Sequence, residues 1–122
     1  MHLFQTGCFR LASGENSTFK IECDALSDDD WWTLSVMIAR AVHPIREVRG
    51  VPRGGLKLAQ CLQAQVNPDG LGCRLLVDDV WTTGGSMLKM LEPNERGCVV
   101  FARNKIVHPR VRALFTMNPM VC

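Results

Sequence analysis

The stretch that most constrains this chain is residues 74–86, an apolar run that ends in two acids and a loop of hydroxyl and glycine residues. Leu75, Leu76 and Val77 are consecutive apolar residues, a pattern typical of a strand buried on both faces of a parallel sheet. The residues after the acids predict a tight turn that leads into a helix. The stretch therefore predicts a strand, a turn and a helix of the α/β class.

The turn consists of Thr82, Thr83, Gly84, Gly85 and Ser86. Its glycines let backbone N–H groups close around an anion, its hydroxyls add donors, and the N-terminus of the following helix supplies positive potential. Asp78 and Asp79 come at the carboxyl end of the strand and are expected to face the same crevice. Carboxylates there can accept hydrogen bonds from ribose hydroxyls, directly or through a divalent cation. The stretch therefore predicts a sugar-phosphate site.

A second glycine-rich loop precedes this site by one strand-helix unit. It consists of Val51, Pro52, Arg53, Gly54, Gly55 and, just beyond, Lys57. Residues 47–51 predict a short strand before it, and residues 56–66 predict a helix after it. The glycines permit a sharp turn, while Arg53 and Lys57 bring cations that suit a pyrophosphate. Taken alone, the segment is equally well read as a structural turn. Beside the first loop, it predicts that two loops at neighbouring strand ends bracket one ligand.

The remaining predicted elements complete one α/β domain that spans residues 1–122. They are a hairpin with strands at 9–12 and 19–23, a helix that starts with a capping box at Ser27 and stops at Pro44, a helix at 86–91, and strands at 98–102 and 112–116. Trp31 and Trp32 are adjacent on the first helix and therefore point in different directions. We expect them to pack in the core or against a second subunit, with at most one of them serving a ligand.

Composition limits the classes of function. A chain of 122 residues, 47% of them hydrophobic, supports one modest core, and a net charge of +2 with scattered basic residues does not indicate nucleic-acid binding. No apolar stretch has membrane-spanning length, and the first residues lack the order of a signal peptide, so we expect a cytoplasmic protein without membrane contact. The six cysteines form no C-x-x-C pair, which favours reduced, mostly buried thiols over disulfides or zinc.

Residues 74–86 resemble the phosphoribosyl pyrophosphate (PRPP) motif of the type I phosphoribosyltransferases, and residues 51–57 resemble the pyrophosphate loop of the same family. The resemblance implies a parallel sheet flanked by helices, with residues 1–26 as a small β-hairpin hood and residues 27–122 as the core. It also implies that Asp78 and Asp79 bind the ribose hydroxyls and, through water or the ribose, Mg²⁺. The hydroxyl-glycine loop would then bind the 5′-phosphate.

Residues 9–19 resemble the opening of the orotate phosphoribosyltransferases, in which a Phe-x-Leu-x-Ser-Gly stretch precedes a serine and an aromatic residue. In those enzymes this segment forms a hood over the base, which implies a base contact for Phe19. An arginine just after the strand that follows the PRPP helix helps to hold the orotate there, and Arg103 occupies that place in this chain. Arg103 is also compatible with a solvated position on the surface.

Two features depart from the orotate enzymes. Ala12 stands where they often carry a lysine, and only about seven residues, 67–73, stand where they have a long mobile loop rich in Lys, Arg and His. The mobile loop and an accompanying strand are therefore expected to be missing. Because that loop closes over the reacting centre, its loss should lower the rate more than the affinity.

The sequence thus predicts a minimal phosphoribosyltransferase that transfers ribose 5-phosphate from PRPP to a nucleobase, orotate or a related pyrimidine, with Asp78, Asp79 and Arg53 as its catalytic residues. Mg²⁺ is the expected cofactor and a homodimer the expected assembly. The alternative is a non-catalytic sensor of PRPP or a nucleotide that kept the binding loops and lost the closing loop. A purely structural subunit is a third reading, which does not account for both acids and both loops.

Overall fold

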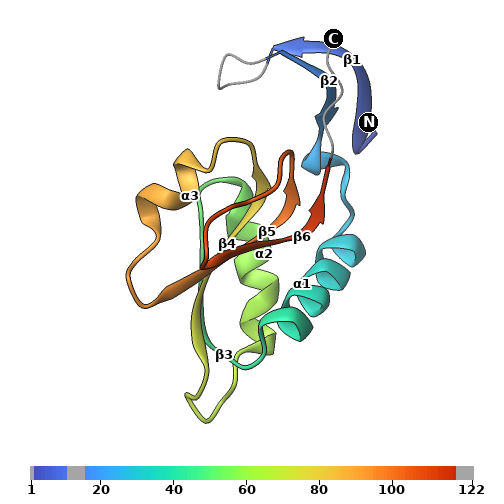
Figure 1. Cartoon of the computed structure of the whole chain (residues 1–122). Helices are drawn as coiled ribbons and strands as arrows, with labels where there is room; N and C mark the ends of the chain where they lie inside the picture. Colours follow the sequence, from blue (N-terminus) through green and yellow to red (C-terminus); the bar gives the residue numbers. More distant parts are fainter. Residues whose placement is uncertain (1, 11–15, 118–122) are drawn as a thin grey trace.

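A computed structural model describes residues 2–10 and 16–117. They form a four-stranded sheet with its helices and a hairpin that lies above the carboxyl ends of the strands (Figure 1). Strands β1 (Phe4–Arg10) and β2 (Asn16–Ile21) pair antiparallel in the hairpin. The sheet has the order β3 (Ile45–Gly50), β4 (Cys73–Trp81), β5 (Glu95–Ala102) and β6 (Val111–Thr116), with all neighbours parallel. The helices are α1 (Asp28–Val42), α2 (Gly54–Leu62) and α3 (Gly85–Met90). The expected fold class, a parallel sheet with a small N-terminal hairpin, is confirmed.

The ends of several elements differ from the prediction. The first strand begins at Phe4, and Ala12 and the turn at 13–15 lie outside the described residues. The second strand ends at Ile21, because a 3₁₀ helix begins at Cys23. Helix α2 begins at Gly54, two residues before the predicted start, and its last predicted turn is a 3₁₀ helix, Gln63–Gln65. These shifts fall at turns and helix ends, where the hydrophobic pattern carries little signal.

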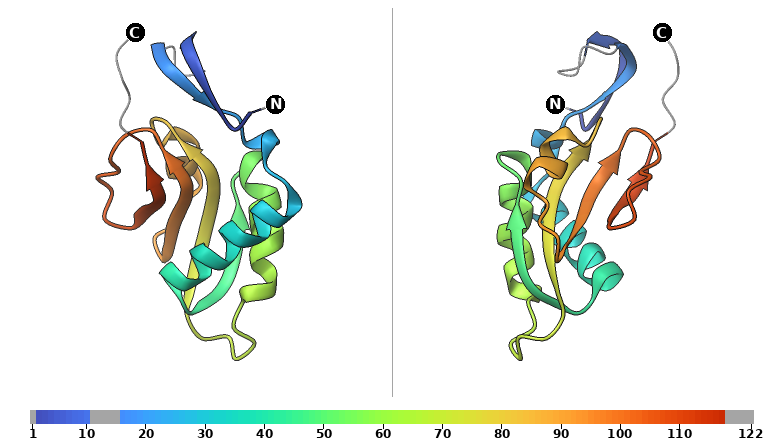
Figure 2. Two further views of the ribbon diagram at one scale, coloured as in Figure 1. Left: turned by 90° about the vertical axis from the view of Figure 1, so that its right-hand side faces the viewer. Right: turned by 60° about the vertical axis from the view of Figure 1, so that its left-hand side comes forward.

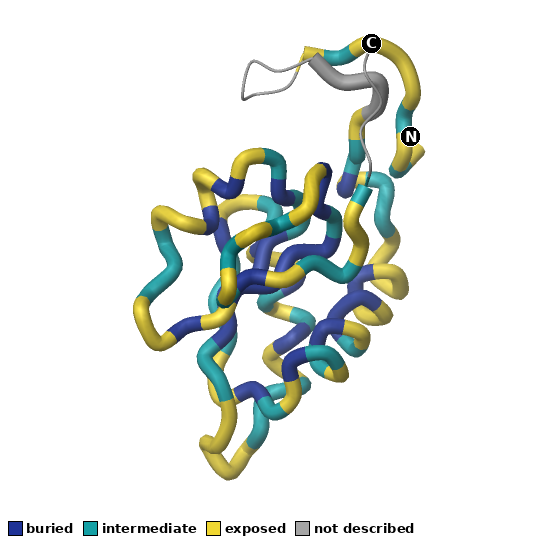
Figure 3. The backbone as a smooth tube through the Cα atoms, viewed as in Figure 1, coloured by how far each residue is buried: buried dark blue, intermediate teal, exposed yellow. Residues whose placement is uncertain are grey.

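Strand β4 is the centre of the sheet and is covered on both faces. Leu75, Leu76 and Val77 are fully buried, as a strand with helices on both sides requires. Leu75 and Val77 pack in a core with α1 and α2, whereas Leu76 packs on the other face with Met87 of α3. Figure 2 shows α1 and α2 on one side of the sheet and α3 on the other, and Figure 3 shows the buried strands between them.

The connections across the sheet have an unusual hand. The crossovers β3–α2–β4 and β4–α3–β5 step in the same direction, yet α2 and α3 cover opposite faces, so the two crossovers are of opposite hand. Nearly all such units are right-handed, and the one through α2 is the left-handed exception (Figure 2). A right-handed return from α2 would place a strand on the outer side of β3. The described residues place none there, which agrees with the expected loss of a strand.

Helix α1 begins with the predicted capping box. The Oγ of Ser27 accepts a hydrogen bond from the backbone N–H of Asp30 at 3.1 Å, and the Oδ2 of Asp30 accepts one from the N–H of Ser27 at 2.9 Å. Trp31 is buried in the core, whereas Trp32 is 47% exposed. The two tryptophans therefore point apart, as expected for neighbours on a helix, and Trp32 is the one that remains accessible.

The cysteines are less buried than predicted. Cys23 and Cys98 are buried, but Cys61 and Cys73 are half-buried and Cys8 is exposed on the hairpin. In residues 2–10 and 16–117, none of these thiols is paired with another. No helix in the same residues is long and apolar enough to cross a membrane.

Candidate functional site

The loop after β4 encloses a small cavity at the carboxyl end of the sheet. The cavity has a volume of about 50 Å³ and is lined by residues 82–86 together with Asp78 and Trp81. A single buried water needs roughly 10–15 Å³ by this measure, so the cavity has room for a small oxyanion and is too small for a nucleobase. The five loop residues predicted to bind a phosphate are therefore brought together around a space of matching size.

The two loop glycines do different work. Gly84 has a φ of 84°, in the left-handed region, and a Cβ atom there would overlap the indole ring of Trp81. Gly85 has no such constraint, because a Cβ atom there would meet only the Thr83 Oγ1 atom, at 3.7 Å. Helix α3 has the six-residue length that the sequence predicted and begins one residue earlier, at Gly85.

Asp78 and Asp79 do not face the same space. Adjacent residues of a strand point to opposite faces, and Asp78 lines the small cavity whereas Asp79 lines a larger one under the hairpin. Each has one carboxylate oxygen engaged locally, since the Oδ1 of Asp78 accepts the N–H of Asp79 at 2.8 Å and the Oδ1 of Asp79 accepts the N–H of Val80 at 2.7 Å. The pair therefore joins the two cavities at the end of β4.

The second glycine-rich loop, at residues 51–57, meets one of the acids directly. Gly54, the first residue of α2, lies so close to Asp79 that a Cβ atom on it would overlap all three atoms of the carboxyl group. Gly55 is packed equally tightly against the backbone carbonyl of Val77, which leaves no room for a side chain. The peptide bond between Pro52 and Arg53 is cis. The loop at residues 51–57 is thus in contact with β4 at Asp79 and Val77, and glycine is required at both points.

The larger cavity, of about 510 Å³, lies between the hairpin and the loop at residues 51–57. From the core it is lined by Arg53, Gly54, Lys57, Asp79 and Trp31, and from the end of the hairpin by residues 21–24 and Leu26. Arg53 is exposed at the start of α2. This volume falls in the usual range for a small-molecule site. The cavity brings the predicted cations of the pyrophosphate loop next to one of the two predicted acids.

Lys57 is held by an ion pair with α1. Its Nζ contacts the Oδ1 of Asp28 at 2.5 Å, and the pair lowers the pKa of Asp28 and raises that of Lys57. Both side chains are largely exposed, and pairs of this kind contribute little to stability. A ligand in the cavity can therefore recruit Lys57 at small cost.

Cys23 lines the larger cavity and was not predicted from the sequence. Burial, together with the charge and a hydrogen bond of Asp79, raises the pKa of the Cys23 thiol far above its usual range. The thiol therefore stays protonated and donates to the carboxylate. Its sequence neighbours gave no signal for this role, because the contact depends on how the end of the hairpin folds back over β4.

Asp78 titrates near neutral pH. Burial, and then its hydrogen bond with Asp79 and the negative charge of that neighbour, raise the pKa of Asp78 from 3.8 to about 7. Between pH 3.8 and about 7, the folded protein keeps a proton on this carboxyl group, whereas the unfolded chain has released it. Its contribution to stability is therefore complete below about pH 4 and is lost as the pH rises through about 7.

We expect Asp78→Asn to make the protein more stable than the wild type at pH 8, by roughly 2 kcal/mol, because the variant buries no charge. At pH 4 the two proteins should be about equally stable. Urea unfolding at several pH values measures this directly. A parallel pH dependence in both proteins would show that Asp78 has no raised pKa.

Arg103 and Phe19 are the two residues predicted to contact a base. Arg103 follows β5 and is only 5% exposed, so it is not the solvated surface residue considered as the alternative. Its backbone N–H donates to the carbonyl of Trp81 at 2.9 Å, but its side chain lines neither of the two cavities. Phe19 pairs with Thr6 in the hairpin. The base contacts of Arg103 and Phe19 remain predictions.

Comparison with known proteins rests on structure. No protein-family model and no curated protein matches the sequence. The structure is similar to the orotate phosphoribosyltransferase of Aeropyrum pernix, with a TM-score of 0.72 and 24% sequence identity over 93% of this chain and 88% of that chain. The same enzyme from Mycobacterium tuberculosis, in complex with inorganic phosphate, gives a TM-score of 0.67 at 16% identity over 92% of this chain and 87% of that chain.

A third similar structure is the orotate phosphoribosyltransferase of Francisella tularensis, with a TM-score of 0.59 and 16% identity over 93% of this chain and 80% of that chain. At these identities the likeness establishes the fold. The fold expected from the residue motifs is confirmed over almost the whole chain, including the hairpin.

Proposed function

We propose that this chain, which has the fold of the orotate phosphoribosyltransferases, is a minimal phosphoribosyltransferase that uses PRPP. One observation carries the proposal: the carboxyl group of Asp79, near the carboxyl end of β4, lies against Gly54, so that this acid and the loop after β3 form one continuous site. A strand-turn-helix connection alone does not require this contact. Ligands of open α/β sheets bind at such strand ends.

The geometry supports a division of PRPP between the two cavities. In this assignment the loop at 82–86 holds the 5′-phosphate in the small cavity, and Asp78 and Asp79 accept hydrogen bonds from the ribose hydroxyls between the cavities. The pyrophosphate then lies in the larger cavity, near Arg53 and Lys57. Both residues line that cavity.

The reaction follows from that placement. A ring nitrogen of the base attacks C1′ of the ribose, the bond from C1′ to the pyrophosphate oxygen breaks, and its electron pair leaves with the pyrophosphate while the nitrogen loses its proton. Positioning of the two reactants accounts for most of the rate. Arg53 stabilises the charge that develops on the pyrophosphate, and Lys57 joins it after its pair with Asp28 opens.

Mg²⁺ fits this site as a companion of the substrate. It favours oxygen ligands, keeps several waters and is commonly bound by one or two carboxylates together with substrate phosphates. Asp78 and Asp79 offer such carboxylates, whereas no group of three or more metal-ligating side chains occurs in the described ranges. Bound there, Mg²⁺ would neutralise charge on the pyrophosphate.

The proposed base is orotate or a related pyrimidine. This part of the proposal rests on the resemblance of residues 9–19 to the hood and on the place of Arg103 after β5. A guanidinium matches a carboxylate with two parallel hydrogen bonds, which suits an anionic base. The proposal includes a homodimer, for which Trp32 and Met37 offer exposed apolar surface on α1.

A non-catalytic PRPP or nucleotide sensor is the second candidate, and the link between α2 and β4 favours it. After the 3₁₀ helix Gln63–Gln65, residues 66–72 lead directly into β4. All of residues 54–81 are described, and they contain no long loop that could close over the site. Without closure, water reaches the reacting centre and the departing charge is less stabilised.

One assay separates the two candidates. We expect the protein with Mg-PRPP and orotate, uracil or a purine base to release pyrophosphate with at least one of the bases, and the Asp79→Asn variant to release none above background. Binding of Mg-PRPP by calorimetry without release for any base would identify a sensor. Absence of both binding and release would contradict the proposed function itself.

A further inference from the structure

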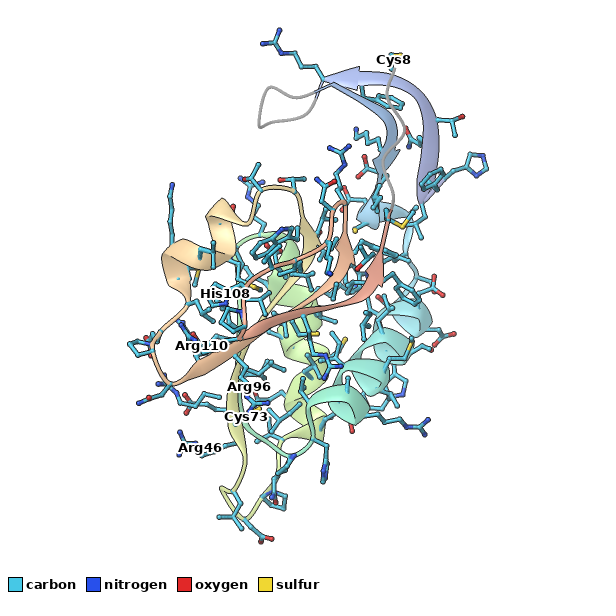
Figure 4. The ribbon with its side chains drawn as sticks, viewed as in Figure 1. Cys8, Arg46, Cys73, Arg96, His108 and Arg110 are labelled. Atoms are coloured by element: carbon cyan, nitrogen blue, oxygen red, sulfur yellow. The ribbon has the colours of Figure 1, made fainter. Side chains whose placement is uncertain are left out.

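A cleft at the opposite end of the sheet gathers positive charge. It lies at the amino ends of β5 and β6, has a volume of about 350 Å³ and includes Arg96, Arg110 and Arg112 in its lining, with no acidic residue. Figure 4 shows Arg96 and Arg110 at the end of the sheet that points away from the hairpin. Because parallel strands carry the proposed PRPP site at their carboxyl ends, this cleft is separate from it.

Strands β5 and β6 bring the arginines of the cleft to one place. The N–H of Gly97 donates to the carbonyl of Arg110 at 2.8 Å, and Cys98 stands opposite Arg112 in the parallel register. Gly97 is also packed against the Met87 Sδ atom, at 2.7 Å from where its Cβ would lie. Arg96 and Arg112 are therefore placed by the sheet, and Arg110 lies in the turn immediately before β6.

Two of the guanidinium groups are held in place. The Nη1 of Arg110 donates to the carbonyls of Glu92, Pro93 and Glu95 at 2.8, 3.1 and 2.7 Å. The Nη1 of Arg112 donates to the carbonyl of Ala41, near the end of α1, at 2.9 Å. These bonds use one nitrogen of each group, whereas a guanidinium carries five N–H donors on three nitrogens. The groups are thus oriented in advance and keep donors for a ligand.

The acids at this end of the sheet already have partners. Glu95 is buried and accepts two hydrogen bonds from Arg49, at 2.8 and 2.6 Å. Burial would raise the pKa of Glu95, but the bonds from Arg49 and from the backbone hold it below its usual value. Glu47 and Glu92 form ion pairs with Arg74 at 2.6 and 2.7 Å.

The three arginines of the cleft are therefore an excess of positive charge. In residues 2–10 and 16–117, no ion pair includes Arg96, Arg110 or Arg112. Like charges that converge on one concave surface repel each other and raise the local concentration of anions. A bound anion would relieve this repulsion.

We infer that the cleft binds a small molecule with a phosphate or pyrophosphate group. The planar fork of a guanidinium matches the oxygens of a phosphate, and several forks around one cleft favour a group with several oxygens. A volume of about 350 Å³ lies in the range of small-ligand sites, and Val42 adds an apolar wall beside the charges. The site is independent of the proposed PRPP site and gives the chain a second place for a phosphorylated metabolite.

The test follows the backbone amides by NMR while inorganic pyrophosphate is added to the ¹⁵N-labelled protein without divalent cations. The amide signals of Gly97 and Val111 should shift and reach saturation. Arg96→Gln combined with Arg112→Gln should weaken this binding at least about tenfold. Any response of Gly84 and Gly85, which report on the other end of the sheet, should stay as in the wild type, so failure of one site is distinguishable from failure of the other.

Arg46→Gln is the matched control, because it removes the same charge from an exposed residue at the same end of the sheet that is outside the lining of the cleft (Figure 4). Its affinity should stay within about twofold of the wild type. An equal loss in this variant, or no saturable shift at Gly97 and Val111, would overturn the inference. So would saturation by an acidic peptide and not by pyrophosphate.

Two further arms complete the test. If the double variant fails to fold, Arg96→Gln alone is used, because Arg96 is exposed and its side chain is not among those that bond to the backbone at this end. A nucleoside 5′-monophosphate titrated in the same way distinguishes the sources of the phosphate. Tighter binding than that of pyrophosphate identifies a nucleotide as the ligand class, and weaker binding identifies a free phosphate compound.

Discussion

Asp79→Asn should weaken the binding of Mg-PRPP at least about tenfold, which corresponds to about 1.4 kcal/mol. The change keeps the shape of the side chain and removes its charge. Hydrogen bonds to charged groups contribute about 1.5–3 kcal/mol, and an amide replaces one acceptor oxygen with a donor that faces the ribose hydroxyls and the cation unfavourably. Asp79 lies near the end of β4 and against the loop at residues 51–57. Loss of its charge therefore affects the place where the strand and this loop meet in the proposed site.

Isothermal titration calorimetry with Mg-PRPP measures this effect. Asp69→Asn is the matched control, because it removes the same charge from an exposed turn remote from both cavities. Its affinity should equal that of the wild type. If Asp79→Asn binds Mg-PRPP as well as the wild type does while remaining folded, the acids near the carboxyl end of β4 do not hold the ribose and the proposed function loses its basis.

Gly84→Ala should destabilise the protein by about 3 kcal/mol. Its φ of 84° costs about 1–2 kcal/mol for a residue with a Cβ atom. That atom would also overlap the ring of Trp81, which is only 8% exposed and packs in the core with Leu76 and Val99. Relief of the overlap therefore requires movement in the core and not only in the loop.

Gly85→Ala separates the role of the loop from the role of glycine. It lies next to Gly84, is exposed, and has space for a Cβ atom, so its free energy of unfolding should change by no more than about 0.5 kcal/mol. Urea unfolding of both variants compares the two positions. Equal stability of the two variants would mean that the left-handed turn at Gly84 does not constrain the loop.

The sequence predicted the core of the fold well because its signals are local. The consecutive apolar residues Leu75 to Val77 indicated a strand buried on both faces, and Ser27 with Asp30 indicated the start of α1. Both signals depend on nearby residues alone. The position of the two glycine-rich loops at neighbouring strand ends also followed from the alternation of strands and helices. The two glycine-rich loops therefore lie after neighbouring strands as predicted, whereas Asp78 and Asp79 line different cavities.

What the sequence left open depends on contacts between distant segments. The thiol of Cys23 reaches Asp79 only because the hairpin folds over β4, and Lys57 is paired with Asp28 across two helices. Neither contact leaves a pattern of spacing in the chain. The different constraints on Gly84 and Gly85 likewise arise from the position of Trp81, which a run of two glycines does not reveal.

The left-handed crossover through α2 has a consequence for solubility. It leaves the outer edge of β3 without a neighbouring strand in the described part of the chain, and such an edge is a template for the growth of intermolecular sheets. Arg46, Glu47 and Arg49 supply three charges within this six-residue strand. Charged residues on an exposed edge strand disfavour pairing with a second molecule, so the charges on β3 protect against aggregation where the fold has lost its cover.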